Sequence, residues 1–496
     1  MKFNKWFSLI LVSSALFLIV IDMTVLYTAL PTITYELEAS AFQKLWIVNA
    51  YPLVVAGLLP GLGTLGDKVG HKNMFLSGLV IFTLASVVAA FSPTSGTLIM
   101  ARVILAIGAA TMMPSTLAII KQVFDDKKDR ALALGIWSSI ASAGAGLGPL
   151  IGGLLLTKFW WGSVFLINVP ITIIVIIIAY IQIPNIKGNK DKKWDITSSI
   201  LIMIGLIGTV YAIKEVTKEN PSIVLIILTL VIGLWSLKLF ISRQKRLSNP
   251  LISLDIFKNK YFLSGVIAAF TSASILIGFE MILSQRLQLI LNMTPLKAGL
   301  VLMSMAAAAF IGAIVQGSIL TRFDTIKILI YNLTISLIGI VGFTAFLHND
   351  LWIQILFLSI AGLGLGGAMT VASNAIMTNV DDDKAGMAAS VEEVSYELGG
   401  SIGIAALGGV FSFTYTYLME RSMSIAEIPA KAKGSFEETM IVAENSNGLL
   451  KSKLLELGTN AFDHAYSLIL IITITIIAAI ILLLWRILAE TGKKIT

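Results

Sequence analysis

The chain has 496 residues, of which 56% are hydrophobic and only 13% charged, and its mean hydropathy is +0.89. Soluble globular proteins carry about 25% charged residues, so the composition excludes a soluble domain and indicates an integral membrane protein. The net charge of +7 does not indicate nucleic-acid binding, because the basic residues lie in short loops between apolar runs, and the lack of cysteine excludes disulfides and thiolate metal sites.

Fourteen apolar runs follow one another along the chain, and they predict an all-α protein, because continuous rather than alternating hydrophobicity is typical of membrane-spanning helices. The runs fall near residues 8–30, 44–64, 74–92, 98–120, 132–157, 164–184, 196–213, 222–241, 262–283, 298–320, 326–347, 352–377, 386–414 and 465–488. The first run continues through Asp22 without a small-residue cleavage site, so we interpret it as a retained span rather than a signal peptide.

The loops differ in their content of lysine and arginine. Most of these residues lie in the two termini and in the loops that would share their side of the membrane. Because basic loops stay in the cytoplasm, this bias predicts that both termini are cytoplasmic, as an even number of spans requires.

The fourteen runs can be divided into six, two and six. The loop after the second run, Gly63–Lys72, has a weaker copy after the tenth run, where Thr321 stands in place of Asp67. Such an internal repeat is typical of transporters built from two related halves.

This division predicts three parts. Residues 1–186 would form an N-terminal six-helix bundle, and residues 187–260 an inserted helix pair with basic cytoplasmic linkers. Residues 261–496 would form a C-terminal six-helix bundle. Its longest hydrophilic segment, at about 415–463, is expected to be an extracellular helical hairpin.

Two opposite charges lie inside apolar runs. Asp22 is about 21 Å along the first run from the inner side, and Arg102 is about 7 Å into the fourth run from the outer side. Both therefore fall in the outer third of a core about 30 Å thick, where contact between them is plausible. A carboxylate at that depth costs about 2.5–3.5 kcal/mol, so Asp22 is either a functional acid or half of a structural ion pair.

The loop after the second run combines glycines with charges, in Gly63, Asp67, Lys68, Gly70 and Lys72. An acid at the inner end of this run would lie near helix N-termini and basic groups of neighbouring spans. It could form a charge–dipole contact that breaks when the inner face opens. The alternative is a charged turn that only obeys the positive-inside rule.

The fifth run has a glycine face. Gly144, Gly148 and Gly152 are four residues apart and share one side of a helix, while Pro149 bends it and Gly153 follows. A face without side chains lets another helix approach closely and could serve as a sliding or rocking surface. The alternative is ordinary tight packing.

The thirteenth run holds the densest acid cluster. Glu393 and Glu397 are four apart and share a face, whereas Glu392 is turned by about 100° from Glu393. Two neighbouring carboxylates in a low-dielectric cavity resist double ionisation, which suits a proton carrier. The alternative is that these acids are solvated near the inner interface. Glu280, near the outer end of the ninth run, is equally compatible with a rim or a cavity position.

Several of these patterns resemble one known family. The pattern G-x-x-x-G-P-x-x-G-G at Gly144–Gly153 resembles the antiporter motif of drug:proton exporters in the major facilitator superfamily. Gly63–Lys72 resembles that family's loop signature except at His71, and Asp22–Pro31 resembles a signature of its fourteen-span branch. The sequence around Arg102 matches only in part, and the thirteenth run resembles that of quaternary-ammonium-compound exporters.

The resemblance implies the major facilitator fold, with fourteen spans as six, two and six. It also implies a proton-coupled antiporter that exports lipophilic, cationic drugs and antiseptics across the bacterial cytoplasmic membrane by alternating access. Asp22, Arg102, Glu280, Glu393 and Glu397 would serve proton coupling and substrate binding. The partners would be lipophilic cations, protons and membrane lipids, and the protein would be a monomer without a metal or other cofactor, driven by the proton gradient.

Other functions remain possible on the sequence alone. The chain could export an endogenous metabolite, or neutral or anionic drugs such as tetracycline. A membrane receptor or enzyme is less well supported, because no nucleophile–base constellation, metal cluster or phosphate-binding loop is found, and the chain has only 3 His. We therefore expect a transporter and no enzyme.

Overall fold

The computed structural model describes residues 5–124, 126–184, 188, 195–216, 221–247, 250–319, 324–380, 385–422, 430–446 and 448–492. Most of the predicted linker at 187–194 and the repeat position Thr321 lie outside these residues. The α-helices are α1 (Lys5–Glu36), α2 (Ala41–Val69), α3 (His71–Ala90), α4 (Ser95–Val123), α5 (Lys127–Lys158), α6 (Ser163–Leu166), α7 (Asn168–Gln182), α8 (Ile196–Val216), α9 (Ile223–Gln244), α10 (Lys260–Gln285), α11 (Pro295–Ile319), α12 (Thr325–Ala345), α13 (Leu351–Thr378), α14 (Ala385–Ser422), α15 (Phe436–Glu444) and α16 (Gly448–Gly492). Two short 3-10 helices, η1 (Leu254–Lys258) and η4 (Ala430–Lys433), and a π-helical turn, η2 (Arg286–Ile290), complete the described secondary structure.

The described part of the chain is all-helical, which confirms the predicted fold class. Thirteen of its helices are long and apolar enough to cross a membrane, with α6 and α7 counted together as one span. The glycine-rich helix α5 adds a shorter apolar stretch, Gly146–Lys158. The total of fourteen spans therefore stays a prediction.

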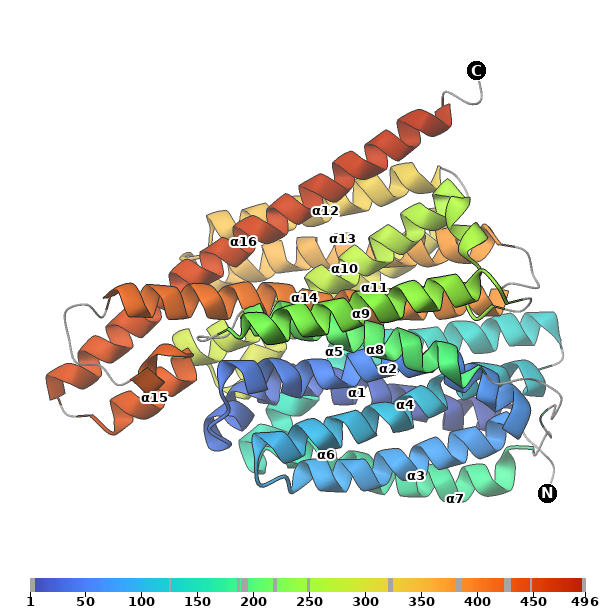
Figure 1. Cartoon of the computed structure of the whole chain (residues 1–496), viewed down its shortest axis with the longest axis horizontal. Coiled ribbons are helices and arrows are strands. Elements are labelled where there is room, and N and C mark those ends of the chain that lie inside the picture. Colours follow the sequence, from blue (N-terminus) through green and yellow to red (C-terminus); the bar gives the residue numbers. More distant parts are fainter. Residues whose placement is uncertain are drawn as a thin grey trace.

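The helices lie side by side along the long axis of the molecule (Figure 1). The start of α1 and the end of α16 lie at one end, which we call the terminal end. At the opposite end α15 packs beside the projecting ends of α14 and α16, and we call this the hairpin end (Figure 1). The segment predicted as a helical hairpin thus caps the end of the molecule opposite the terminal end.

The last helix differs from its prediction. The sequence suggested a hairpin at about 415–463 and a separate span at 465–488, but α16 continues without a break over 45 residues. Gly458 is tolerated inside this helix and lies against Phe436 and Tyr415. Close packing at this glycine lets one helix serve both the hairpin end and the membrane region (Figure 1).

The helices pack in groups that follow the chain. Among the first seven, α1 packs on α5, and α4 packs on both α2 and α3. Among the later ones, α10 packs on α14, and α13 packs on both α11 and α12. The groups meet where α5 contacts α11 and where α2 contacts α14, while α8 and α9 pair with each other and α8 lies against α2. This arrangement is compatible with the six, two and six division, which stays a prediction.

The glycine face of α5 lies against α1. A Cβ atom added at Gly148 would overlap the side chain of Thr24, and one added at Gly144 would lie 3.2 Å from Val20 Cβ. At Gly152 the added Cβ would lie 3.1 Å from the carbonyl oxygen of Val25. This face therefore joins two helices of the predicted N-terminal bundle, and the contact is tight because the side chains are absent.

The other side of α5 forms the contact with α11. A Cβ added at Gly153 would lie 2.6 Å from Leu296 Cα, and one added at Gly299 would overlap the carbonyl oxygen of Pro149. The two predicted bundles therefore touch backbone to backbone here, at Pro149 and Gly153. The sliding surface expected at the Gly144–Gly148–Gly152 face stays a prediction, and this second side of α5 lies where the two predicted bundles meet.

We predict that Gly148→Ala destabilises the protein by about 1–3 kcal/mol, because the new methyl group would overlap Thr24. The melting temperature of the purified protein in detergent measures this effect. Gly96→Ala is the matched control, since its Cβ would meet only Thr94 Oγ1 at 3.9 Å and alanine favours helices. Equal melting temperatures for the two variants would show that α1 and α5 are not tightly packed at Gly148.

Candidate functional site

A buried ion pair occupies the centre of the first helix group. Arg102 of α4 donates from its guanidinium to Asp22 Oδ2 of α1, and the two side chains are 1% and 0% exposed. The contact that the sequence made plausible is therefore present. Because each charge neutralises the other, both can remain in an apolar interior.

Neighbouring helices complete the environment of this pair. Asn168 of α7 donates to Asp22 Oδ1 at 3.1 Å, and Arg102 Nε donates to the carbonyl oxygen of Ile47 at 3.3 Å. The guanidinium also lies 4.5 Å from the centre of the Tyr51 ring, a cation–π contact. Four helices, α1, α2, α4 and α7, thus converge on one charge-neutral cluster.

The charged loop between α2 and α3 is a tight helix-to-helix turn. Gly70 has φ +102°, a conformation that favours glycine, and its N–H donates to Gly66 O at 2.8 Å. Lys72 donates to the carbonyl oxygen of Tyr180 at 2.8 Å, near the C-terminus of α7, where the helix dipole favours a positive charge. Lys68 is exposed. The side chain of Asp67 lies outside the described residues.

The acids of α14 lie inside the helix bundle. Glu393 and Glu397 are about 12 Å and 18 Å from the start of the helix. Glu397 is 8% exposed and Glu393 is partly buried. Within the described part of the chain neither carboxylate has a hydrogen bond or an ion pair, and the two are close enough to interact electrostatically. Glu392, by contrast, bonds to Ser373 and Tyr396.

Glu280 joins this group from another helix. It lies near the hairpin end of α10, is 8% exposed, and has no hydrogen-bonding partner among the residues that the structure describes. Tyr27 of α1 is within electrostatic reach of both Glu280 and Glu397. The position of Glu280, which the sequence left open between rim and cavity, is therefore interior.

The ion pair and the acids are neighbours. Tyr51 lies against Arg102 and is also within electrostatic reach of Glu397. Asp22 and Arg102 lie on helices of the first group, whereas Glu280 and Glu397 lie on helices of the later group. Glu393 lies one turn farther along α14 toward the terminal end.

Cross-bundle hydrogen bonds close the interior on the hairpin side of Glu397. Asn49 of α2 accepts from Ser401 Oγ of α14 at 2.8 Å, and both side chains are fully buried. Ser284 of α10 donates to the carbonyl oxygen of Tyr27 at 2.8 Å, and Gln288 donates to that of Thr28 at 3.0 Å. The acids therefore lie on the terminal side of these contacts.

The sequence did not single out Asn49 or Asn168. Each is a polar or half-polar residue inside an apolar run, and this was the available signal. The partner of each residue, however, is on a different helix far away in the sequence, so this signal does not say what the side chain contacts.

We predict that Asp22→Asn destabilises the protein by about 3–5 kcal/mol, because it leaves the Arg102 charge buried without a counterion. The double variant Asp22→Leu with Arg102→Met should recover most of the loss, since it removes both charges. Thermal unfolding of the purified variants measures both effects.

The control for this experiment is Asp255→Asn. Asp255 pairs with Lys258, but its side chain is 80% exposed, so the melting temperature should not change. If Asp22→Asn melts at the same temperature as Asp255→Asn, the buried pair does not stabilise the fold.

Known proteins similar to the chain are membrane transporters and resistance proteins. The family model of the Major Facilitator Superfamily matches residues 12–404. The chain is 33% identical over 496 residues to "Methyl viologen resistance protein SmvA" of Salmonella typhimurium, covering 99% of this chain and 100% of that protein. It is 34% identical over 463 residues to "Multidrug efflux pump LfrA" of Mycolicibacterium smegmatis, covering 93% and 92%.

Solved structures agree on the fold. A bacterial homolog of the human lysosomal transporter Spinster, in an inward-facing and occupied conformation, is similar with a TM-score of 0.67 at 16% identity, covering 97% of this chain and 96% of that one. The same protein in its inward-facing and unoccupied conformation gives 0.68 at 16% identity, covering 99% and 98%. The chain therefore belongs to the Major Facilitator Superfamily and is a multi-pass membrane transporter, not an enzyme.

Proposed function

We propose that the protein exports lipophilic cations, including drugs and antiseptics, across the bacterial cytoplasmic membrane in exchange for protons. The observation that carries the proposal is a set of interior acids, Glu280, Glu393 and Glu397, for which the described part of the chain supplies no hydrogen-bonding or ionic partner. The chain has the fold of a transporter family. Relatives named for multidrug efflux and methyl viologen resistance support a drug substrate. Methyl viologen is an organic cation, which supports the charge of the proposed substrate.

The acids suit the exchange for a simple electrostatic reason. A cationic drug is attracted by ionised carboxylates, and a proton bound to the same carboxylate removes that attraction. One interior site therefore cannot hold both well, and binding of one favours release of the other. No cofactor is needed, because the energy comes from the proton gradient.

Two neighbouring acids on α14 fit a ratio above one proton per drug. A proton that enters down a membrane potential of 100 mV supplies about 2.3 kcal/mol, and expelling a monovalent cation costs a similar amount. One proton per drug would gain nothing from the voltage, whereas two would gain from both the voltage and the pH difference. Glu393 and Glu397 offer two sites one helical turn apart.

We assign Asp22 a different role. The sequence offered it as a third proton-binding acid, but its carboxylate is engaged by both Arg102 and Asn168. A carboxylate that is engaged by two partners on other helices joins those helices together. We therefore infer that Asp22 and Arg102 hold α1, α2, α4 and α7 in position beside the interior acids.

The cycle would proceed by alternating access. Asn49–Ser401 and the bonds to the carbonyl groups of Tyr27 and Thr28 join the two predicted bundles on the hairpin side of the acids. These contacts would have to break when the hairpin end opens. Because these contacts lie on the hairpin side, we infer a state in which drug reaches Glu393 and Glu397 from the terminal end, which we place in the cytoplasm.

We predict that Glu393→Gln lowers pH-driven export of a fluorescent monovalent cation at least about tenfold and abolishes proton release on drug binding, because glutamine cannot exchange a proton. Glu397→Gln should act in the same direction but less completely. Transport is measured in inverted vesicles with an imposed pH gradient, and proton release with the purified protein.

Glu392→Gln is the matched control, because this acid is engaged by Ser373 and Tyr396 and should tolerate the change. The proposal would be falsified if a correctly inserted Glu393→Gln/Glu397→Gln protein exported monovalent cations with unchanged dependence on the pH gradient.

We also predict that the hairpin end faces outward and both termini face the cytoplasm. The chain has no cysteine, so single cysteines can report the side. In intact cells a membrane-impermeant maleimide should label Ser452→Cys, which is exposed on α16, but not Lys258→Cys in η1. Lys258→Cys should be labelled only after permeabilisation, and the reverse pattern would invert the proposed orientation.

A further inference from the structure

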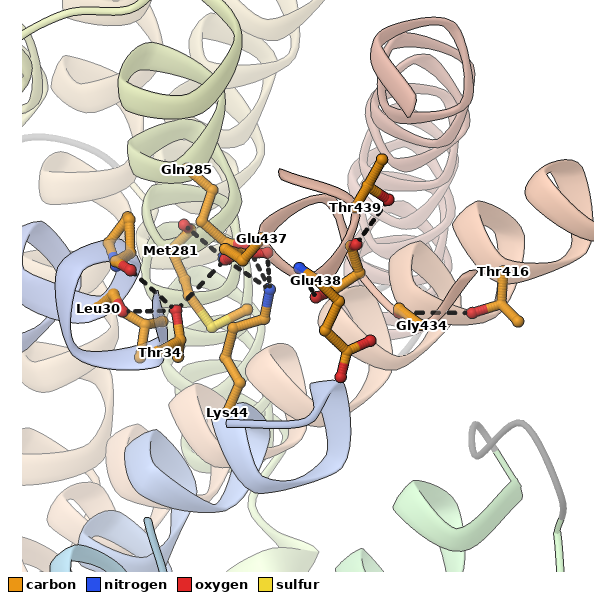
Figure 2. Close-up of polar contacts among 12 residues, drawn as sticks. Leu30, Thr34, Lys44, Met281, Gln285, Thr416, Gly434, Glu437, Glu438 and Thr439 are labelled. Atoms are coloured by element: carbon orange, nitrogen blue, oxygen red, sulfur yellow. Dashed lines mark hydrogen bonds and ion pairs between the residues drawn. The ribbon is translucent and has the colours of Figure 1, made fainter. Parts of the chain in front are cut away.

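The hairpin end contains a second buried ion pair. Lys44 of α2 donates to Glu437 of α15, with Nζ 3.1 Å from Oε1 and 3.2 Å from Oε2 (Figure 2). The side chains are 8% and 3% exposed. Lys44 also donates to Gln285 Oε1 of α10 at 2.9 Å, and Thr34 of α1 donates to Glu437 Oε1 at 3.4 Å. The charge of Glu437, on the short helix α15, is thus buried beside the ends of α1, α2 and α10.

Helix α15 is attached to the later helices of the chain. Ser435 caps its N-terminus by accepting from the N–H of Glu438 at 3.2 Å. Thr439 bonds to the hydroxyl of Tyr415 on α14 at 2.6 Å, and the Phe436 ring packs on the Phe462 ring of α16 at 5.9 Å. These contacts attach α15 to α14 and α16, so α15 should move with these two helices.

The contacts on the other side of α15 all reach the first helices. Lys44 and Thr34 bond to Glu437, and Tyr35 of α1 donates to Glu444 at 2.5 Å. We propose that α15 is a latch: it holds the hairpin end closed through the Lys44–Glu437 ion pair and releases Lys44 each time this end opens. The inference rests on the alternating access of the proposed function.

The burial of the pair explains how such a latch can be both firm and reversible. In a dry interface the two charges attract strongly and neither can be left alone. When the hairpin end opens, water reaches both groups, so hydration replaces the lost contact. The pair therefore stabilises the closed state relative to intermediate ones. Neutralising Glu437 alone would leave Lys44 buried without a counterion and favour the open, hydrated state.

The first test measures opening directly. Met281→Cys places a thiol in the small cavity under the latch, beside Lys44 and Gln285, where Met281 is 1% exposed (Figure 2). Maleimide labelling of this cysteine in the purified full-length protein should become about tenfold faster when Glu437→Gln is added, because the closed state is less populated. Exchanging the charges, with Lys44→Glu and Glu437→Lys together, should restore slow labelling.

Glu456→Gln is the matched control, since Glu456 is an exposed acid of the same hairpin and should leave the rate unchanged. Equal labelling rates in the Met281→Cys protein with and without Glu437→Gln would overturn the latch. Fast labelling of the charge-exchanged protein would also overturn it, provided that the melting temperature of this protein is unchanged. Because labelling does not require a transported cation, it decides about the latch independently of the proposed function.

The second test asks whether the latch must release during transport. In a Lys44→Cys/Glu437→Cys protein, a short reducible bifunctional thiosulfonate should abolish export of a fluorescent monovalent cation, and reduction should restore it. Undiminished export by the cross-linked protein would show that α15 stays docked throughout the cycle and would refute the latch. If labelling were faster in Glu437→Gln but the protein without substitutions exported no cation, the latch would stand and the proposed function alone would be refuted.

Discussion

The high cost of an unpaired charge in an apolar interior governs how this protein uses its few charged residues. One class is neutralised by partners, as Asp22 is by Arg102 and Lys44 is by Glu437. The other class consists of acids that are buried without such a partner in the described residues, Glu397 above all. In the proposed function, an acid of the second class binds a proton and a cation in turn.

The two ion pairs differ in what they join. Asp22 and Arg102 lie on helices of the same group, so their contact can persist while the two groups move. Lys44 and Glu437 belong to parts that separate in the proposed cycle, when the hairpin end opens. The same physical contact can therefore fix the shape of one bundle or control the distance between two. What decides between these roles is which helices carry the charges.

Close backbone packing complements the charges. Helices in a membrane are not driven together by water, so they depend on van der Waals contact between small residues. On α5 one side contacts α1 through Gly144, Gly148 and Gly152, and another contacts α11 through Pro149 and Gly153. The first side can build a stable bundle, while the second lies where the bundles meet. A single helix thus supports both the rigidity of one half and its approach to the other.

The sequence by itself determined the helical membrane class, the approximate positions of the spans and the acids of α14, because apolar runs and charges within them are local features. It also made a contact between Asp22 and Arg102 plausible, because both residues fall in the outer third of the membrane core. Only the tertiary structure showed that Asn168 and Tyr51 complete that cluster, and that Glu280 lies in the interior near Tyr27.

The tertiary structure also decided which side of α5 meets which neighbour, since four-residue spacing defines a face but not its partner. The pairing of Lys44 with Glu437 is a stronger case, because the two residues are 393 positions apart in the chain. Nothing local to either one marks the other. Spacing along a helix fixes which side chains share a face, whereas contacts between helices depend on how the whole chain packs.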